Sequence, residues 1–169
     1  MATTTPALAS ATYKDQIREI VVPKITHLML DKIVTGINQS IPNNVGTTLS
    51  WVDVIQDDVS AFSAGAPTRI TVPAGYNHCR VMAHVEWATN GTGYRSFRIN
   101  FDGSAATEPN YSPTDVRTPN GTITDHQNVN SVWMDVTPAQ YMEVLVRQNS
   151  GGALDATYPA TRIVVEWYP

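Results

Sequence analysis

The sequence contains a single cysteine, Cys79. One cysteine excludes an intrachain disulfide and any metal site built from several cysteines. It stands among alternating apolar residues, on the apolar side of a predicted strand. Because unpaired cysteines are frequently buried, we interpret Cys79 as a small hydrophobic core residue rather than as a reactive thiol.

Charge is also scarce: charged residues make up 15% of the 169-residue chain, and the formal net charge is −4. The sequence has no basic patch, which argues against nucleic-acid binding. It has no run of about 18 apolar residues, so we expect no membrane insertion. Residues 1–10, MATTTPALAS, lack the charged stretch and apolar core of a secretory signal. We therefore expect a protein that is made in a cytoplasm and used as it stands.

From residue 39 onward, helical periodicity gives way to alternation of apolar and polar residues. In the most regular run, one face carries Cys79, Val81, Ala83, Val85 and Trp87, and the other carries Arg80, Met82, His84 and Glu86. Phe97, Ile99 and Phe101 continue the pattern in the next run. Turn residues separate the runs at 73–75, 90–91 and 102–103, and the Asn–Gly pair at 90–91 predicts a tight turn with positive φ at both residues. Residues 70–103 therefore predict a meander of half-buried antiparallel strands.

Four further segments predict strands, at 47–55, 122–136, 141–148 and 162–168, and the first strand of the meander is expected over 68–72. The 47–55 segment changes its apolar face near Trp51, which indicates a bulge or bend. In 122–136 we expect Val132, Met134 and Val136 on one side. Residues 104–120 contain three prolines and predict a long surface loop, a kind of segment that often carries function. Short strands with regular turn signals predict an all-β, antiparallel fold of about 8–10 strands, either a sandwich or a jelly roll, with the last strand inside a sheet.

The first 38 residues differ from the rest in composition. All three lysines, Lys14, Lys24 and Lys32, lie in this part. We interpret residues 1–38 as an N-terminal anchoring arm and 39–169 as the head domain, although so few lysines could also cluster by chance. A short helix is predicted from Thr12, and residues 25–34 fit a strand and a helix equally well. The apolar residues expected to anchor the arm are Ile17, Ile20, Val21, Ile25, Leu28 and Leu30.

Four motif segments of the head carry a resemblance to a known family. Their residues are Val72, Pro73, Ala74 and Gly75; Asn90, Gly91, Gly93 and Arg95; Arg98, Ile99, Asp102 and Gly103; and Tyr141, Glu143, Val144, Val146, Gln148, Ser150, Gly151 and Gly152. These segments resemble the jelly-roll heads of complement globular-head and tumour-necrosis-factor type, and more closely their versions in bacteriophage structural proteins. The sequence departs from the motifs at Asn77 and at residues 137–140. Of the two folds, the resemblance implies the antiparallel jelly-roll sandwich, here with a short N-terminal arm, and it implies assembly as a homotrimer.

Large aromatic side chains at strand ends are more numerous than one thin sandwich core needs. We take them as candidates for the subunit interface, with ordinary core or edge packing as the alternative for each. They are Trp51, Trp87, Trp133, Tyr141, Trp167 and Tyr168.

The sequence gives no sign of a catalytic set. The histidines His27, His78, His84 and His126 are scattered along the chain, and neighbouring strand residues such as His78 and Cys79 point to opposite faces. Asp53, Asp57 and Asp58 offer oxygen ligands for calcium, but a solvated loop explains them better because calcium requires more ligands. We therefore expect no enzyme, no cofactor and no metal.

These expectations together favour a structural protein of a bacteriophage virion, made in the host cytoplasm. The leading hypothesis is a trimeric capsid decoration or cement protein, which the arm attaches to the major capsid protein or another virion protein. The short segment before the head suits clamping onto a lattice better than forming a fibre shaft. The alternative is the receptor-binding knob of a head or tail fibre, which would recognise a host surface glycan or protein through residues 104–120.

Overall fold

The computed structural model describes residues 25–31, 38–105, 114–118 and 125–169. Fourteen strands are assigned within these ranges, and no helix. The strands are β1 (Thr26–Asp31), β2 (Gln39–Ile41), β3 (Thr47–Thr48), β4 (Asp53–Asp57), β5 (Ile70–Thr71), β6 (His78–Trp87), β7 (Arg95–Phe101), β8 (Ser104–Ala105), β9 (Thr114–Arg117), β10 (Asp125–Asn130), β11 (Met134–Asp135), β12 (Tyr141–Gln148), β13 (Leu154–Ala156) and β14 (Arg162–Tyr168). The all-β prediction is confirmed.

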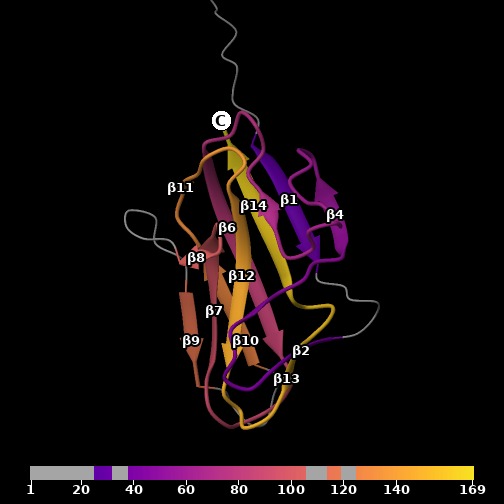
Figure 1. The fold of residues 1–169 in the computed structure, drawn as a ribbon, viewed down its shortest axis with the longest axis vertical. Coiled ribbons are helices and arrows are strands. Elements are labelled where there is room, and N and C mark those ends of the chain that lie inside the picture. Colours follow the sequence, from indigo (N-terminus) through magenta and orange to yellow (C-terminus); the bar gives the residue numbers. More distant parts are fainter. Residues whose placement is uncertain (1–24, 32–37, 106–113, 119–124) are drawn as a thin grey trace, which may run out of the picture.

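The strands form two antiparallel sheets that enclose one core (Figure 1). The eight-stranded sheet has the order β2-β13-β6-β14-β1-β4, and β10 and β11 pair with β6. The six-stranded sheet has the order β3-β12-β7-β8, with β5 on β12 and β9 on β7. Strand β14 lies between β6 and β1, so the last strand is inside a sheet as predicted. Among the described residues, no helix is long and apolar enough to cross a membrane.

The core confirms the alternation in the two most regular runs. Along β6 every second residue is buried, from Cys79 to Trp87. Along β7 the residues Phe97, Ile99 and Phe101 are buried as well. Burying a large apolar side chain contributes about 1.5–3 kcal/mol, so these facing strands supply much of the stabilisation.

The N-terminal boundary of the head differs from the prediction. Strand β1 lies within the range assigned to the arm, yet it pairs with β14 over six residues and with β4 on its other side. Residues 26–31 are therefore part of the eight-stranded sheet, and of the two periodicities that fitted this segment the strand is the one formed. The helix expected from Thr12 lies outside the described residues.

Two predicted strands are interrupted. The 47–55 segment divides into β3 and β4, which belong to different sheets, and buried Trp51 lies at the crossing between them. This confirms the bend expected there. The 122–136 segment divides into β10 and β11, and Val132 between them is 76% exposed. Met134 and Val136 are buried, so the prediction that Val132 lies on one side with them is wrong, because the strand alternation does not continue through the break.

The turn residues of the motifs mostly behave as predicted. Asp102 and Gly103 both have positive φ, as a tight hairpin turn requires. The 90–93 turn is different, because its residue with positive φ is Gly93 and neither Asn90 nor Gly91 has one. The two-residue turn predicted for Asn90 and Gly91 is therefore wrong, and the chain makes a longer connection.

Two motif segments meet at one end of the sandwich, where Gly93 packs directly against Asn149. The Tyr94 N–H donates to Asn149 Oδ1 over 2.5 Å, and the Asn149 N–H donates to the Tyr94 carbonyl over 3.3 Å. Buried Gln148 binds the carbonyls of Ile41 and Gly152 through its side-chain amide. These contacts give the motif residues a structural role in joining turns from both sheets.

Arg95 is fully buried beside this junction. Its guanidinium donates to the main-chain carbonyls of Asn90, Thr92 and Tyr94, each over 3.0 Å. Burial lowers the pKa of Arg95, and the negative charge of Asp125 raises it in part. The arginine thus fixes the 90–94 turn from inside the fold.

Candidate functional site

All four histidines of the chain lie on the same side of the eight-stranded sheet, the side that faces away from the core. His27 is on β1, His78 and His84 are on β6, and His126 is on β10. On these strands the residues of opposite parity, such as Thr26, Cys79 and Gln127, are buried. The histidines are scattered in the sequence, but antiparallel pairing gathers them on one surface.

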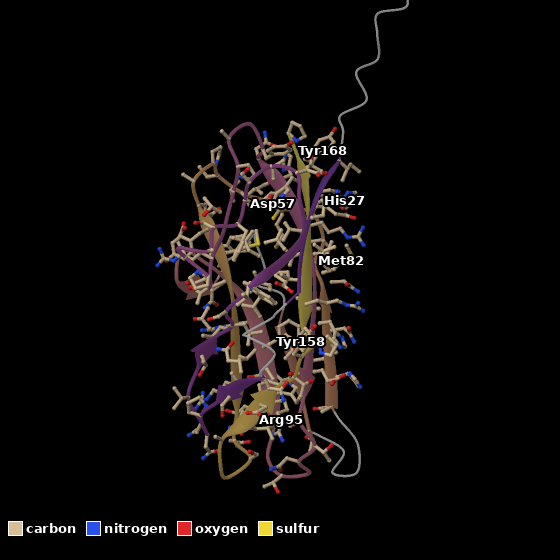
Figure 2. The ribbon with its side chains drawn as sticks, turned by 90° about the vertical axis from the view of Figure 1, so that its right-hand side faces the viewer. His27, Asp57, Met82, Arg95, Tyr158 and Tyr168 are labelled. Carbon is tan, nitrogen blue, oxygen red and sulfur yellow. The ribbon has the colours of Figure 1, made fainter. Side chains whose placement is uncertain are left out.

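We call this surface the histidine face. Its other members come from β6, β10 and β14, and Figure 2 shows His27 and Met82 projecting from the same side of the molecule. The face consists of His27, His78, Arg80, Met82, His84, Glu86, His126, Asn128, Arg162, Val164 and Glu166.

Each histidine of the face has an oxygen partner. His27 Nε2 lies 3.4 Å from Glu166, which also lies 3.8 Å from Arg80. His78 Nδ1 lies 2.8 Å from Asp135 Oδ1. These pairs are partly exposed, so each contributes at most about 1 kcal/mol to folding. The pairs place imidazole nitrogens next to carboxylate oxygens on the solvent side of the sheet.

The densest group on the histidine face is formed by two neighbouring strands. His126 is directly opposite Glu86, and Asn128 is directly opposite His84. His126 Nδ1 lies 3.3 Å from Glu86 Oε2, and His84 Nδ1 lies 2.7 Å from Asn128 Oδ1. The two imidazole rings stack with their centroids 5.4 Å apart and an interplanar angle of 30°. One ligand atom from each of His84, Glu86 and His126 lies within 4.8 Å of the others.

The sequence pattern alone does not reveal this group. The one local signal is the parity of His84 and Glu86, which share a strand face two residues apart. Their partner His126 could be identified only once the register of β10 on β6 was known.

An exposed apolar surface lies at the end of the same sheet, and we call it the apolar end patch. It consists of Ile25, Trp133, Tyr168 and the ring of His78, which line a shallow pocket of about 360 Å³. Trp133 packs edge-on against Tyr168 with ring centroids 6.1 Å apart. Exposed fractions of 44% for Ile25, 46% for Trp133 and 37% for Tyr168 leave much apolar area in contact with water.

The predicted interface aromatics divide into two groups. Trp51, Trp87 and Trp167 are at most 1% exposed within the single chain. They have no surface left for a neighbouring subunit, so their interpretation as interface residues is corrected to core packing. Trp133 and Tyr168 are exposed in the apolar end patch, and Tyr141 is half-buried beneath the Arg69 guanidinium at 4.1 Å.

The predicted anchoring residues are only partly placed. Ile25 lies in the apolar end patch at the start of β1. Leu28 and Leu30 belong to β1, and their side chains lie outside what the structure describes. Ile17, Ile20 and Val21 also lie outside the described residues. The prediction that 104–120 is a loop is wrong where the structure describes it, because 104–105 and 114–117 form β8 and β9 on the edge of β7.

Two of the three acidic residues considered as calcium ligands, Asp57 and Asp58, accept hydrogen bonds from residues close to them in the chain. The Asp57 carboxylate accepts hydrogen bonds from the main-chain N–H groups of Val59, Ala61 and Phe62. Asp58 accepts one from the Gln56 side chain. Asp57 therefore orders the loop after β4, which is a structural role.

Cys79 and His78 point to opposite sides of the sheet, as expected. Cys79 is buried, and burial raises the pKa of its thiol to about 12. A thiol with this pKa stays protonated near neutral pH and is a poor nucleophile.

The sheet order and the paired core strands define the class of fold, a jelly roll of tumour-necrosis-factor type. The crystal structure of murine APRIL at pH 5.0 has a TM-score of 0.59 with this chain at 11% identity, covering 85% of this chain and 99% of that one. Murine APRIL structures at pH 8.0 and pH 8.5 give a TM-score of 0.57 with the same identity and coverage. At this identity the likeness shows the fold alone. No family model matches the chain, and no curated protein does.

Proposed function

We propose that this protein is a structural component of a bacteriophage virion, a homotrimeric jelly roll that decorates the capsid and is attached through its N-terminal segment. The motif resemblance described above supports a virion role, and the jelly-roll fold is compatible with it. We infer binding rather than catalysis, since the exposed surfaces described above suit contacts with macromolecules.

The observation that carries the proposal is the apolar end patch. Tryptophan is enriched in the buried centres of protein interfaces, and exposed apolar patches mark interaction sites. Covering Ile25, Trp133 and Tyr168 with a neighbouring subunit would remove this area from water. The trimer proposed here uses this end of the eight-stranded sheet as a contact.

The patch also supports attachment through the N-terminal segment. Ile25 is the residue at which the chain enters β1, so residues 1–24 connect to the fold at the edge of the patch. Ile17, Ile20 and Val21 lie in this segment and would supply apolar contacts to a capsid protein.

Removing the N-terminal segment tests attachment to the capsid separately from assembly of the trimer. Removing residues 1–24 leaves β1 intact, whereas removing 1–38 would delete the strand between β14 and β4. We expect the 25–169 protein to keep the full-length subunit number and thermal midpoint, and to lose binding to undecorated capsids in co-sedimentation. Full decoration of capsids by the truncated protein would refute the anchoring role.

A point substitution tests the assembly contact. Trp133→Ser should shift the trimer toward monomer in analytical ultracentrifugation at micromolar concentration. Val116→Ser is the matched control, because Val116 is 63% exposed on the other sheet and should not change the mass. Equal behaviour of the two variants would argue against the patch as the contact.

The second candidate is a receptor-binding knob. It is favoured by a pocket of about 310 Å³ on the six-stranded sheet, lined by residues that include Arg98, Val116 and Arg147. Strand β9 borders this pocket and belongs to the 104–120 segment. The knob predicts that purified protein binds host cells and competes with infection, and absence of cell binding at high protein concentration would exclude it.

A further inference from the structure

We propose that His84, Glu86 and His126 form a binding site for a divalent transition-metal ion with the ligand preferences of Zn²⁺. Two imidazoles and one carboxylate are a donor set typical of three-ligand zinc sites. Calcium and magnesium prefer sites built of oxygen ligands, so the set discriminates against them. This inference is independent of the proposed virion function.

The geometry needs little adjustment to reach metal coordination. Ligand atoms in a tetrahedral zinc site lie about 3.3 Å apart, given metal–ligand distances of about 2.0–2.1 Å. The three candidate ligand atoms already lie within 4.8 Å of one another. The side chains of His126 and Glu86 are 47% and 19% exposed, so the imidazole has room to change rotamer. The remaining gap is about 1.5 Å, and the proposal assigns its closure to rotation of the exposed His126 side chain between staggered rotamers.

The surroundings orient two of the three ligands. Because the oxygen of an amide only accepts hydrogen bonds, the 2.7 Å contact to Asn128 Oδ1 places the proton of His84 on Nδ1 and leaves Nε2 with a lone pair for a metal. The Glu86 oxygen Oε1 accepts a hydrogen bond of 2.6 Å from the Thr157 hydroxyl. Such outer contacts fix the tautomer and direction of metal ligands.

One of the three ligands, His84, borders open space, and Glu86 and His126 do not line that space. A hollow of about 150 Å³ adjoins His84 and is lined in part by Asn128 and Arg162. A water molecule occupies about 30 Å³ in the liquid, so water fits in this hollow next to His84. The Glu86 carboxylate offsets part of the ion's charge, and Arg162 is exposed and can extend into solvent.

The experiment uses the full-length protein, stripped of metal with a chelator and dialysed. Titration with ZnCl₂ in a calorimeter should show one ion bound per chain, and CoCl₂ should give the absorption bands of a four-coordinate cobalt complex. His84→Asn and His126→Asn should each weaken Zn²⁺ binding by about tenfold or more. His78→Asn is the matched control, since His78 has an acidic partner on the same face and should leave the affinity unchanged.

A second pair of variants tests the orientation of the ligands without removing one. Asn128→Asp gives the His84 N–H a carboxylate acceptor, which raises the basicity of the ligating nitrogen and should tighten Zn²⁺ binding. Asn130→Asp adds the same charge on the same side of β10, two residues further along, and should tighten it less. Failure of the wild-type protein to bind Zn²⁺ or Co²⁺, or unchanged binding by the His84→Asn, His126→Asn double variant, would overturn the proposal.

Discussion

Gly93 provides the sharpest test of how the two motif segments hold the fold together. Its φ is +76°, and a Cβ atom built there falls onto the carbonyl and side-chain oxygens of Asn149, with the Asn149 carbonyl carbon at 2.7 Å. The main-chain atoms of Asn149 cannot rotate away as a flexible side chain would. Gly93→Ala therefore combines conformational strain with steric overlap.

Gly75→Ala separates these two costs. Gly75 has a similar φ of +86°, but a Cβ built there meets nothing within 4 Å. Left-handed φ costs an alanine about 1–2 kcal/mol, and overpacking adds about 1–3 kcal/mol. Gly75→Ala should show the first cost alone, whereas Gly93→Ala should show both.

Thermal unfolding at one fixed protein concentration measures the difference, because the midpoint of an oligomer depends on concentration. For a chain of this size, 1 kcal/mol corresponds to roughly 2–4 °C. We expect the midpoint of Gly93→Ala to lie at least several degrees below that of Gly75→Ala. Equal midpoints for the two variants would refute the role of the Gly93–Asn149 contact.

Three further predictions concern buried polar and titratable groups. Gln127 accepts a hydrogen bond of 2.8 Å from the Trp87 indole N–H and donates one to the Arg95 carbonyl on β7. Gln127→Leu leaves both buried groups without this partner. The free energy of unfolding, measured by urea titration, should therefore fall by about 1–3 kcal/mol. Asp57→Ala removes the acceptor of three main-chain N–H groups and should destabilise by a similar amount, whereas Asp58→Ala should have little effect. Burial raises the pKa of the Cys79 thiol from 9.0 to about 12, so the unfolded chain ionises first and the free energy of unfolding should fall above pH 9, by up to about 1.4 kcal/mol per pH unit.

Each of these predictions has a result that would contradict it. A Gln127→Leu protein as stable as the wild type would show that the buried amide contributes nothing net. Equal loss in Asp57→Ala and Asp58→Ala would mean that loop ordering is not specific to Asp57. Cys79→Ala should lose the extra slope above pH 9, and rapid reaction of native Cys79 with a thiol reagent at pH 8 would contradict its burial.

The sequence predicted the strands that are buried on one face and long enough to repeat the pattern. β6, β12 and β14 each alternate over seven or more residues, and their bounds or faces were confirmed. Strands of three residues, such as β2 and β13, carry too few residues to show a period and were not predicted. β1 was ambiguous because its apolar residues satisfy both helical and strand spacing.

The candidate sites were harder to predict than the fold. The pairing of β6 with β10 joins residues about forty positions apart, and local pattern carries no information about that register. Residues of the same type also differ in burial: Trp167 lies in the core, whereas Trp133 lies on the surface. A position at the end of a strand does not distinguish the two tryptophans, because it does not show which face of the sheet is covered by the other sheet of the same chain.

The subunit number of the full-length protein in solution tests the central claim most directly. Sedimentation equilibrium at micromolar concentration should give three times the 18.5 kDa mass of the chain. That result would accord with burial of the apolar end patch between subunits. A mass of one chain across the concentration range would contradict the homotrimer and, with it, the proposed role in decorating a capsid.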